Sequence, residues 1–224
     1  MQGTLYQPSP IETIKGMGEG VLLINKPPHW TSFDVVKKVR GILGIKKVGH
    51  AGTLDPLATG LLILCIGKAT KQIKHFQELK KVYTGTIGLG KTTPSMDLET
   101  PFENEKEYNH LTESAIHAAA QNFVEVIEQI PPTYSAIKVD GKRAYAQVRQ
   151  GKQPILEPRK VTIHQFTIQE ITLPELKFEV TCSKGTYIRS LAHDLGKSLG
   201  VGGYLHTLCR ESIGDYSLQD AHDI

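Results

Sequence analysis

Six consecutive apolar residues, Leu61 to Ile66, constrain the fold of this chain more than any other feature. A short apolar run with β-branched members is typical of a buried strand. The twelve residues before it, 49–60, read GHAGTLDPLATG and contain three glycines, one proline and a single carboxylate, Asp55. A loop held by a core strand is a common place for a reactive group. The sequence therefore places Asp55 on a tight loop anchored to the core, although an aspartate can also simply cap such a turn.

Hydrophobic spacing predicts further elements on both sides of this strand. We expect a strand over 21–24, and then a helix that opens with a capping box between Thr31 and Asp34 and stops at Gly44. Other expected elements are a short helix over 68–79, a strand over 81–89, a helix from Thr112 to the Pro131-Pro132 pair, a half-buried strand over 176–183 and a helix over 187–199. Because these elements lack a regular βαβ alternation, the predicted class is α+β, with a mixed, largely antiparallel sheet flanked by helices.

Composition narrows the classes of protein to consider. The longest apolar runs are far shorter than the roughly 20 residues needed to cross a bilayer, and residues 1–20 lack the apolar region of a secretory signal. The three cysteines are widely spaced and form no CxxC pair. This pattern favours reduced thiols in a cytoplasmic protein without a membrane partner.

Charge is unevenly distributed along a chain whose formal net charge is only +3. Basic residues gather at 37–47 and 138–160, and acidic residues gather at 97–113. Such segregation predicts a basic face for a polyanion and a solvated acidic side, although these charges could equally be ordinary solvated surfaces.

One motif competes with the Asp55 loop for a functional interpretation. Residues 85–92, GTIGLGKT, satisfy the P-loop pattern GxxxxGK[ST]. A P-loop requires a helix that starts at the Lys-Thr pair, so that its amides face the phosphates. The following residues contain two prolines and no apolar periodicity, so a strand is favoured and a P-loop NTPase is the less favoured alternative. No histidine or cysteine cluster has the spacing of a zinc site, so no metal is expected.

Several segments together resemble the TruB-type tRNA pseudouridine synthases. They are the Asp55 loop, GVLLINKP at 20–27, KVY at 81–83, PTYSAIK at 132–138, CSKGTYIR at 182–189 and LCR at 208–210. The resemblance spans nearly the whole chain and implies a pseudouridine synthase fold. It also implies that the chain converts uridine 55 in the T loop of tRNA to pseudouridine, with neither a metal nor an organic cofactor. The expected partner is the T arm of tRNA, and no obligatory protein partner is implied.

The resemblance also assigns roles to individual residues. Asp55 is the expected nucleophile of a covalent intermediate, Arg189 keeps it charged and oriented, and Tyr83 stacks on the flipped base and takes the carbon-5 proton. The expected substrate-binding residues are Lys26, His50, Tyr187 and Leu208. The expected contacts to the tRNA backbone are Lys138, Lys142, Arg143 and Arg149, within a basic loop at about 132–160 whose Gly141 and Gly151 suit a hinge.

The same resemblance organises the chain into an N-terminal tail, 1–19, and one catalytic domain, 20–224. The RNA-binding PUA domain of longer family members is not expected here. Pro94 and Thr100 replace residues that are usually acidic and glycine, whereas Asp97 is retained. An alternative from another class is an RNA-binding or RNA-folding protein without catalysis. A buried carboxylate would be of no use for binding neutral uracil, so Asp55 together with Arg189 disfavours that alternative.

Overall fold

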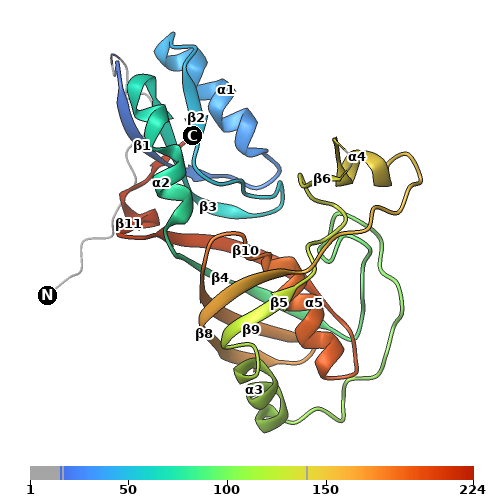
Figure 1. The fold of residues 1–224 in the computed structure, drawn as a ribbon. Helices are drawn as coiled ribbons and strands as arrows, with labels where there is room; N and C mark the ends of the chain where they lie inside the picture. The colour runs from blue at the N-terminus through green and yellow to red at the C-terminus, as the bar shows by residue number, and fades with distance from the viewer. Residues whose placement is uncertain (1–15, 17, 140) are drawn as a thin grey trace, which may run out of the picture. The chain divides into compact units, whose positions relative to one another are not determined.

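The computed structural model describes residue 16, residues 18–139 and residues 141–224. Most of the expected N-terminal tail, residues 1–15 and 17, lies outside this range. The chain divides into two compact units, one ending at Tyr83 and completed by Leu208–Ile224, the other formed by Thr84–Thr207. It passes between them inside two strands, β4 (Lys81–Leu89) and β10 (Gly203–Ile213). Each unit is described by itself below (Figure 1).

The first unit is built on a sheet whose strand order is β12-β1-β3-β10. Strand β1 (Gly20–Lys26) is antiparallel to β3 (Thr59–Ile66) and parallel to β12 (His222–Asp223). Strand β10 runs parallel to β3, with Arg210 opposite Gly60. Two short strands complete the unit: β2 (Val48–His50) pairs with β3, and β11 (Tyr216–Ser217) pairs with β10.

The apolar run in β3 is buried on both faces of this sheet, which confirms the expected strand. Leu62, Leu64 and Ile66 join one hydrophobic cluster, which includes residues of α1 (Ser32–Leu43). Leu61, Ile63 and Cys65 join a second cluster, which includes Phe76 and Ile213. All six side chains are 0% exposed. Alternate residues of a strand point to opposite faces, so this one strand holds both layers of the unit together.

Helix α1 begins and ends as its sequence predicts. The Thr31 hydroxyl accepts a hydrogen bond from the Asp34 amide at 3.1 Å, and the Asp34 carboxylate accepts one from the Thr31 amide at 2.9 Å. This is the expected capping box. Gly44 ends the helix in the left-handed conformation, with φ of 69°. The expected helix over 68–79 forms in two pieces, a 3₁₀ helix η2 (Gly67–Gln72) and α2 (Ile73–Glu78), and a further 3₁₀ turn, η3 (Leu218–Asp220), precedes β12.

The second unit has the strand order β10-β4-β9-β8-β5. Strands β5 (Glu125–Gln129), β8 (Arg159–Thr172) and β9 (Glu175–Cys182) form consecutive antiparallel pairs. Helices α3 (Glu113–Gln121) and α5 (Ile188–Ser198) belong to this unit (Figure 1). The fold is thus the predicted α+β type, with a mostly antiparallel sheet.

The helix predicted from Thr112 to Pro131 is wrong in its second half. Helix α3 ends at Gln121, and residues Glu125–Gln129 form β5 instead. Ile127, which falls within the predicted helix, lies opposite Val161 of β8. The segment 124–127 includes three β-branched residues, and pairing with β8 overrides the helical spacing.

The structure contradicts the P-loop alternative. Residues 85–89 continue β4, and residues 91–112 contain no helix. A Cβ on Gly88 would lie 2.3 Å from the Tyr204 ring, and one on Gly85 would lie 2.2 Å from the Thr207 carbonyl oxygen. Strand packing therefore explains these glycines. Lys91 reaches the Glu105 carboxylate at 3.1 Å rather than a phosphate cradle.

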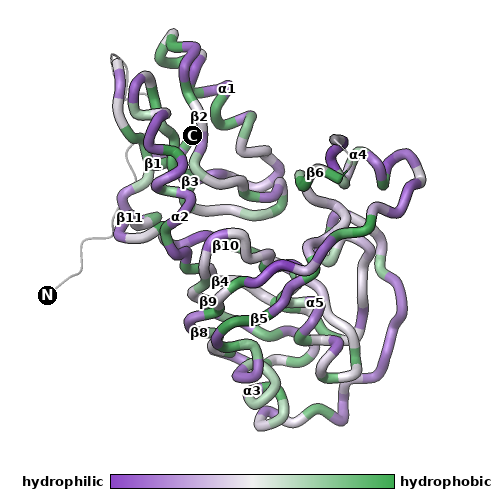
Figure 2. Tube along the Cα trace, in the orientation of Figure 1, coloured by the Kyte–Doolittle hydropathy of each residue, from purple (hydrophilic) through white to green (hydrophobic). Residues whose placement is uncertain are grey.

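The basic loop at 132–160 has local structure of its own within the described residues. Strand β6 (Lys138–Val139) pairs with β7 (Lys142–Arg143), and α4 (Ala144–Val148) follows. Gly141 and Gly151 both have positive φ, 77° and 75°. Figure 2 shows hydrophilic residues along much of the chain around α4.

Candidate active site

Asp55 occupies the first position of a tight turn in the first unit. Its carbonyl oxygen accepts a hydrogen bond from the Ala58 amide at 3.1 Å. Pro56 follows it, and proline pre-sets the φ that the second position of such a turn requires. The Asp55 side chain is partly exposed, whereas Leu54 and Ala58 are 3% exposed. The loop thus presents its carboxylate while its neighbours anchor it in the core.

Ser32 holds the residue before Asp55. Its hydroxyl accepts a hydrogen bond from the Leu54 amide at 2.9 Å and donates one to the Leu54 carbonyl at 3.2 Å. Ser32 is 2% exposed and lies in the first turn of α1, directly after the Thr31 cap. Both main-chain groups of Leu54 are therefore fixed by one side chain that the capped helix itself orients.

Two groups hold the residue after Asp55. The Pro56 carbonyl accepts hydrogen bonds from the His29 amide at 2.8 Å and from the Lys26 ammonium at 3.2 Å. The ammonium also donates to the carbonyls of Trp30 at 2.7 Å and Pro27 at 2.9 Å. Lys26 is 0% exposed, so its charge lies beneath the loop and its three donors are matched by three carbonyls. Its expected contact with substrate stays a prediction.

Arg210 of β10 holds the start of the loop. Its guanidinium donates to the carbonyls of Gly52 at 3.2 Å, Thr53 at 3.5 Å and Leu61 at 2.7 Å. Three side chains therefore hold the main chain on either side of Asp55: Ser32, Lys26 and Arg210. A carboxylate held through its own backbone is preorganised for attack.

Two titratable side chains close to Asp55 in the first unit, Lys26 and His50, have shifted pKa values. Burial lowers the pKa of Lys26 from 10.5 to about 8; the nearby Asp55 carboxylate opposes this shift, and Arg210 reinforces it. Burial also lowers the pKa of His50, in β2, and Arg210 adds to the effect. His50 is therefore neutral near pH 7, when its imidazole can accept as well as donate a hydrogen bond.

The first unit holds two further expected site residues. Tyr83, in β4, is 8% exposed. Leu208, in β10, is partly exposed, and its carbonyl accepts a hydrogen bond from the Thr59 hydroxyl at 3.2 Å, at the other end of the Asp55 loop. Asp55, Lys26, His50, Tyr83 and Leu208 thus all belong to one compact unit.

The second unit holds Arg189, in the first turn of α5, at 3% exposure. Its guanidinium donates to the carbonyls of Ser95 at 3.1 Å and Tyr134 at 3.0 Å, and its Nε lies 3.6 Å from the Asp97 carboxylate. Arg189 is therefore buried, although it lies at the start of a helix. Three separate segments of the unit fix this guanidinium, so its direction is set before any substrate binds.

The prediction that the acidic residues at 97–113 are solvated is wrong for Asp97. Its side chain is 7% exposed, and its carboxylate faces Arg189 and accepts a hydrogen bond from the Glu99 amide at 2.9 Å. The Thr93 and Ser95 hydroxyls donate to its carbonyl at 2.6 and 3.1 Å. The Asp97 carboxylate offsets the cost of burying the Arg189 charge, which explains why Asp97 is buried. Glu103, by contrast, is exposed as predicted.

Tyr187 caps the N-terminus of α5 and is held by Gln129 of β5. The side-chain nitrogen of Gln129 donates to the Tyr187 carbonyl at 3.0 Å, and its side-chain oxygen accepts a hydrogen bond from the Tyr187 main-chain amide at 2.7 Å. Gln129 is 2% exposed. This doubly bonded side chain fixes the residues that lead into Arg189.

Three side chains of the basic loop, Arg143, Tyr145 and Arg149, form an arginine–aromatic stack. The guanidinium carbons of Arg143 and Arg149 lie 6.0 and 5.6 Å from the Tyr145 ring centroid. Arg149 also lies 3.9 Å from the Glu99 carboxylate. Lys142, Arg143 and Arg149 are exposed, as phosphate contacts require, whereas the Lys138 side chain lies outside what the structure describes.

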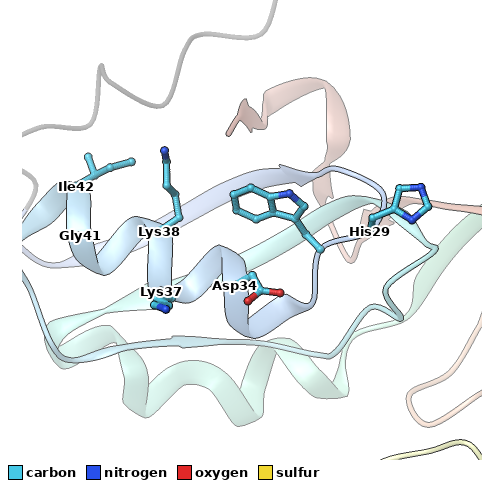
Figure 3. A pocket seen from close by; sticks show the side chains of 7 residues that line it. His29, Asp34, Lys37, Lys38, Gly41 and Ile42 are labelled. Atoms are coloured by element: carbon cyan, nitrogen blue, oxygen red, sulfur yellow. The ribbon is translucent and has the colours of Figure 1, made fainter.

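A separate groove of about 650 Å³ lies along α1 (Figure 3). Its lining residues are His29, Trp30, Asp34, Lys37, Lys38, Gly41 and Ile42. Asp34 is engaged in the capping box, so the groove offers two free lysine charges beside an indole. Across the described residues, no cluster of His, Cys, Asp or Glu side chains is arranged to hold a metal ion. None of the described helices has the length and apolar content needed to span a membrane.

Sequence reasoning gave no role to several residues that shape the site. No sequence pattern indicated the roles of Ser32 and Gln129, because each binds main-chain groups that are distant in sequence. Arg210 lies in a segment that carried the resemblance, but nothing in that segment indicated which groups it binds. Asp97 was noted as a retained acid and was counted with the solvated acidic residues, so its contact with Arg189 was missed.

Solved structures identify the class of fold. A structure described as a Cbf5-Nop10-Gar1 complex contains a chain that is 30% identical, with a TM-score of 0.69 over 88% of this chain and 50% of that chain. The arrangement is that of the pseudouridine synthase fold.

Sequence comparisons identify the family. The family model described as "TruB family pseudouridylate synthase (N terminal domain)" matches residues 40–188. A protein of Flavobacterium johnsoniae named tRNA pseudouridine synthase B is 49% identical over 96% of each chain. One of Phocaeicola vulgatus with the same name is 50% identical over 89% of this chain and 88% of the relative. This chain belongs to the TruB family of pseudouridylate synthases.

Proposed function

We propose that this protein isomerises uridine 55 in the T loop of tRNA to pseudouridine, with Asp55 as the nucleophile of a covalent intermediate. The observation that carries the proposal is the coincidence of two features in one segment. The loop that bears the family signature is also the loop whose main chain is held on both sides of its carboxylate.

The proposed chemistry matches what these residues offer. The bond from uracil N1 to the ribose breaks, the base turns, and carbon 5 forms the new bond to the ribose. The carbon-5 proton leaves and N1 gains a proton, so composition and oxidation state do not change. Asp55 divides the hard step in two and is regenerated. Tyr83 and Arg189 take the roles that the family resemblance implies, namely proton acceptor and charged support.

Reaching the uridine requires its extrusion from the folded T loop, at a cost of a few kcal/mol. We infer that Tyr83, Tyr187 and Leu208 recover part of this cost by packing against the base. Lys142, Arg143 and Arg149 add contacts to phosphates from the basic loop. Their exposure supports this assignment.

The experiment incubates purified protein with an unmodified tRNA transcript and maps pseudouridine by nucleotide position. Asp55→Asn should bind the transcript as the wild type does and lose turnover by roughly 10⁴-fold or more, because an amide is a poor nucleophile. The matched control is Asp215→Asn, an exposed aspartate after β10, which should keep wild-type turnover. Pseudouridine at another nucleotide would reassign the substrate. Binding without any product would favour an RNA-binding protein without catalysis.

A further inference from the structure

Arg210 and Lys26 are the two largest fully buried side chains among the described residues. Arginine and lysine are rarely buried completely, and a buried charge usually has a carboxylate partner. Arg210 is 1% exposed, and its hydrogen bonds go to three main-chain carbonyls instead. A fully buried arginine bonded only to main-chain carbonyls in this way is unusual, which suggests that Arg210 has a specific structural role.

The three carbonyls lie at the two ends of the reactive loop. Gly52 and Thr53 precede Asp55 by three and two residues, and Leu61 follows Gly60, where the loop enters the core of β3. One rigid guanidinium therefore joins the start of the loop to its end. The planar fork of arginine suits this geometry, because its donors point in fixed directions.

The loop is also shaped to receive Arg210. Gly60 has φ of 100°, and a Cβ there would lie 2.5 Å from the Arg210 carbonyl oxygen and 2.6 Å from its amide nitrogen. Gly52 has φ of 108°, and a Cβ there would lie 3.7 Å from the guanidinium. Glycine at Gly60 thus lets the Arg210 main chain approach the end of the loop, while the Arg210 side chain reaches its start.

We propose that Arg210 is a positioning residue for Asp55, which acts through the main chain of residues 52–61 and does not touch substrate. The inference rests on the proposed function, in which Asp55 is the nucleophile. A displacement of about 1 Å in a catalytic group can lower the rate by about 10²-fold. If Arg210 fixes both ends of this loop, its loss should therefore lower the rate by a similar factor.

Kinetics on three variants test the proposal. Arg210→Gln should lower kcat at saturating tRNA by about 100-fold and change the Kd for tRNA by less than about threefold. Arg210→Lys keeps the charge, but its single nitrogen cannot replace the three separate nitrogens with which Arg210 reaches both ends of the loop. Its kcat should therefore lie between those of the wild type and Arg210→Gln. The matched control is Arg40→Gln, a partly buried arginine of the same unit that donates to the Val48 carbonyl at 2.7 Å. Its kcat should equal that of the wild type.

Two readouts that do not depend on turnover separate this inference from the proposed function. Hydrogen exchange of the amides of residues 49–61 should be faster in Arg210→Gln than in Arg40→Gln. NMR titration of His50 should show a higher pKa in Arg210→Gln, because the guanidinium is one cause of its low pKa. Both measurements remain valid if the wild type makes no pseudouridine, a result that would contradict the proposed function alone.

Each outcome decides the proposal. A folded Arg210→Gln variant with wild-type kcat and unchanged loop exchange would overturn it. Equal losses of kcat in Arg210→Gln and Arg40→Gln would show a general effect on stability and would also overturn it. If Arg210→Gln does not fold, Arg210→Lys decides by the same measurements, and wild-type kcat in that variant would refute positioning by the fork.

Discussion

Replacement of Ser32 by alanine should loosen the Asp55 loop, and the loss of stability can be calculated from the hydrogen bonds that Ser32 makes. The hydroxyl is bonded to both the N–H and the C=O of Leu54, and the site is 2% exposed. Alanine leaves both buried groups without this partner. Each such loss costs about 1–3 kcal/mol, so for the two groups together we expect the free energy of unfolding to fall by about 2–6 kcal/mol.

Urea unfolding of the Ser32→Ala variant measures that loss, and turnover at saturating tRNA measures its effect on chemistry. We expect kcat to fall by about 10- to 100-fold, because Leu54 directly precedes Asp55. The matched control is Ser198→Ala. Ser198 is an exposed residue at the end of α5 whose hydroxyl donates to the Leu195 carbonyl at 2.8 Å, and its loss should cost less than about 0.5 kcal/mol. If Ser32→Ala were as stable and as active as Ser198→Ala, the main chain alone would hold the loop and our reasoning would be refuted.

Three other predictions concern charged residues. Lys91→Ala should leave pseudouridine formation without ATP or Mg²⁺ normal, and measurable ATP hydrolysis by the wild type would contradict this. Neutralising Lys142, Arg143 or Arg149 should each lower the slope of log K against log [salt] for tRNA binding by about 0.7–0.9, and an unchanged slope would remove these residues from the RNA interface. Between pH 8 and 10.5 the unfolded chain keeps the Lys26 proton that the folded chain has released, so raising the pH across this range should stabilise the fold by about 2–3 kcal/mol. Urea unfolding at both ends of the range should show that gain in the wild type and not in Lys26→Met.

Local patterns predicted the parts of the fold that local physics determines. The apolar run at 61–66, the Thr31–Asp34 capping box and the Gly44 stop each depend on neighbours within a few residues, and all three are confirmed. The helix predicted over 124–130 is wrong, because the conformation of this segment depends on β8, whose paired residues are 30 to 38 positions away.

The residues that hold the candidate site in place could not be predicted, because they too act on residues distant in sequence. Ser32 acts on a residue 22 positions away, and Arg210 acts on one 158 positions away. Asp97 was assigned to the surface because its neighbours in sequence are acidic, and only the folded unit brings a buried arginine to it. Periodicity carries no information about such partners.

The separation between Gly52 and Arg210 has a consequence for the newly made protein. At about 5–20 residues per second, the ribosome needs roughly 8–32 s to add the 158 residues from Thr53 to Arg210. All of Thr84–Thr207, the whole second unit, is translated in that interval. Ser32 and Lys26 are made before the loop and can hold it as soon as it emerges, whereas the guanidinium arrives last. A nascent chain therefore acquires the final geometry of its Asp55 loop only after the entire second unit has been synthesised.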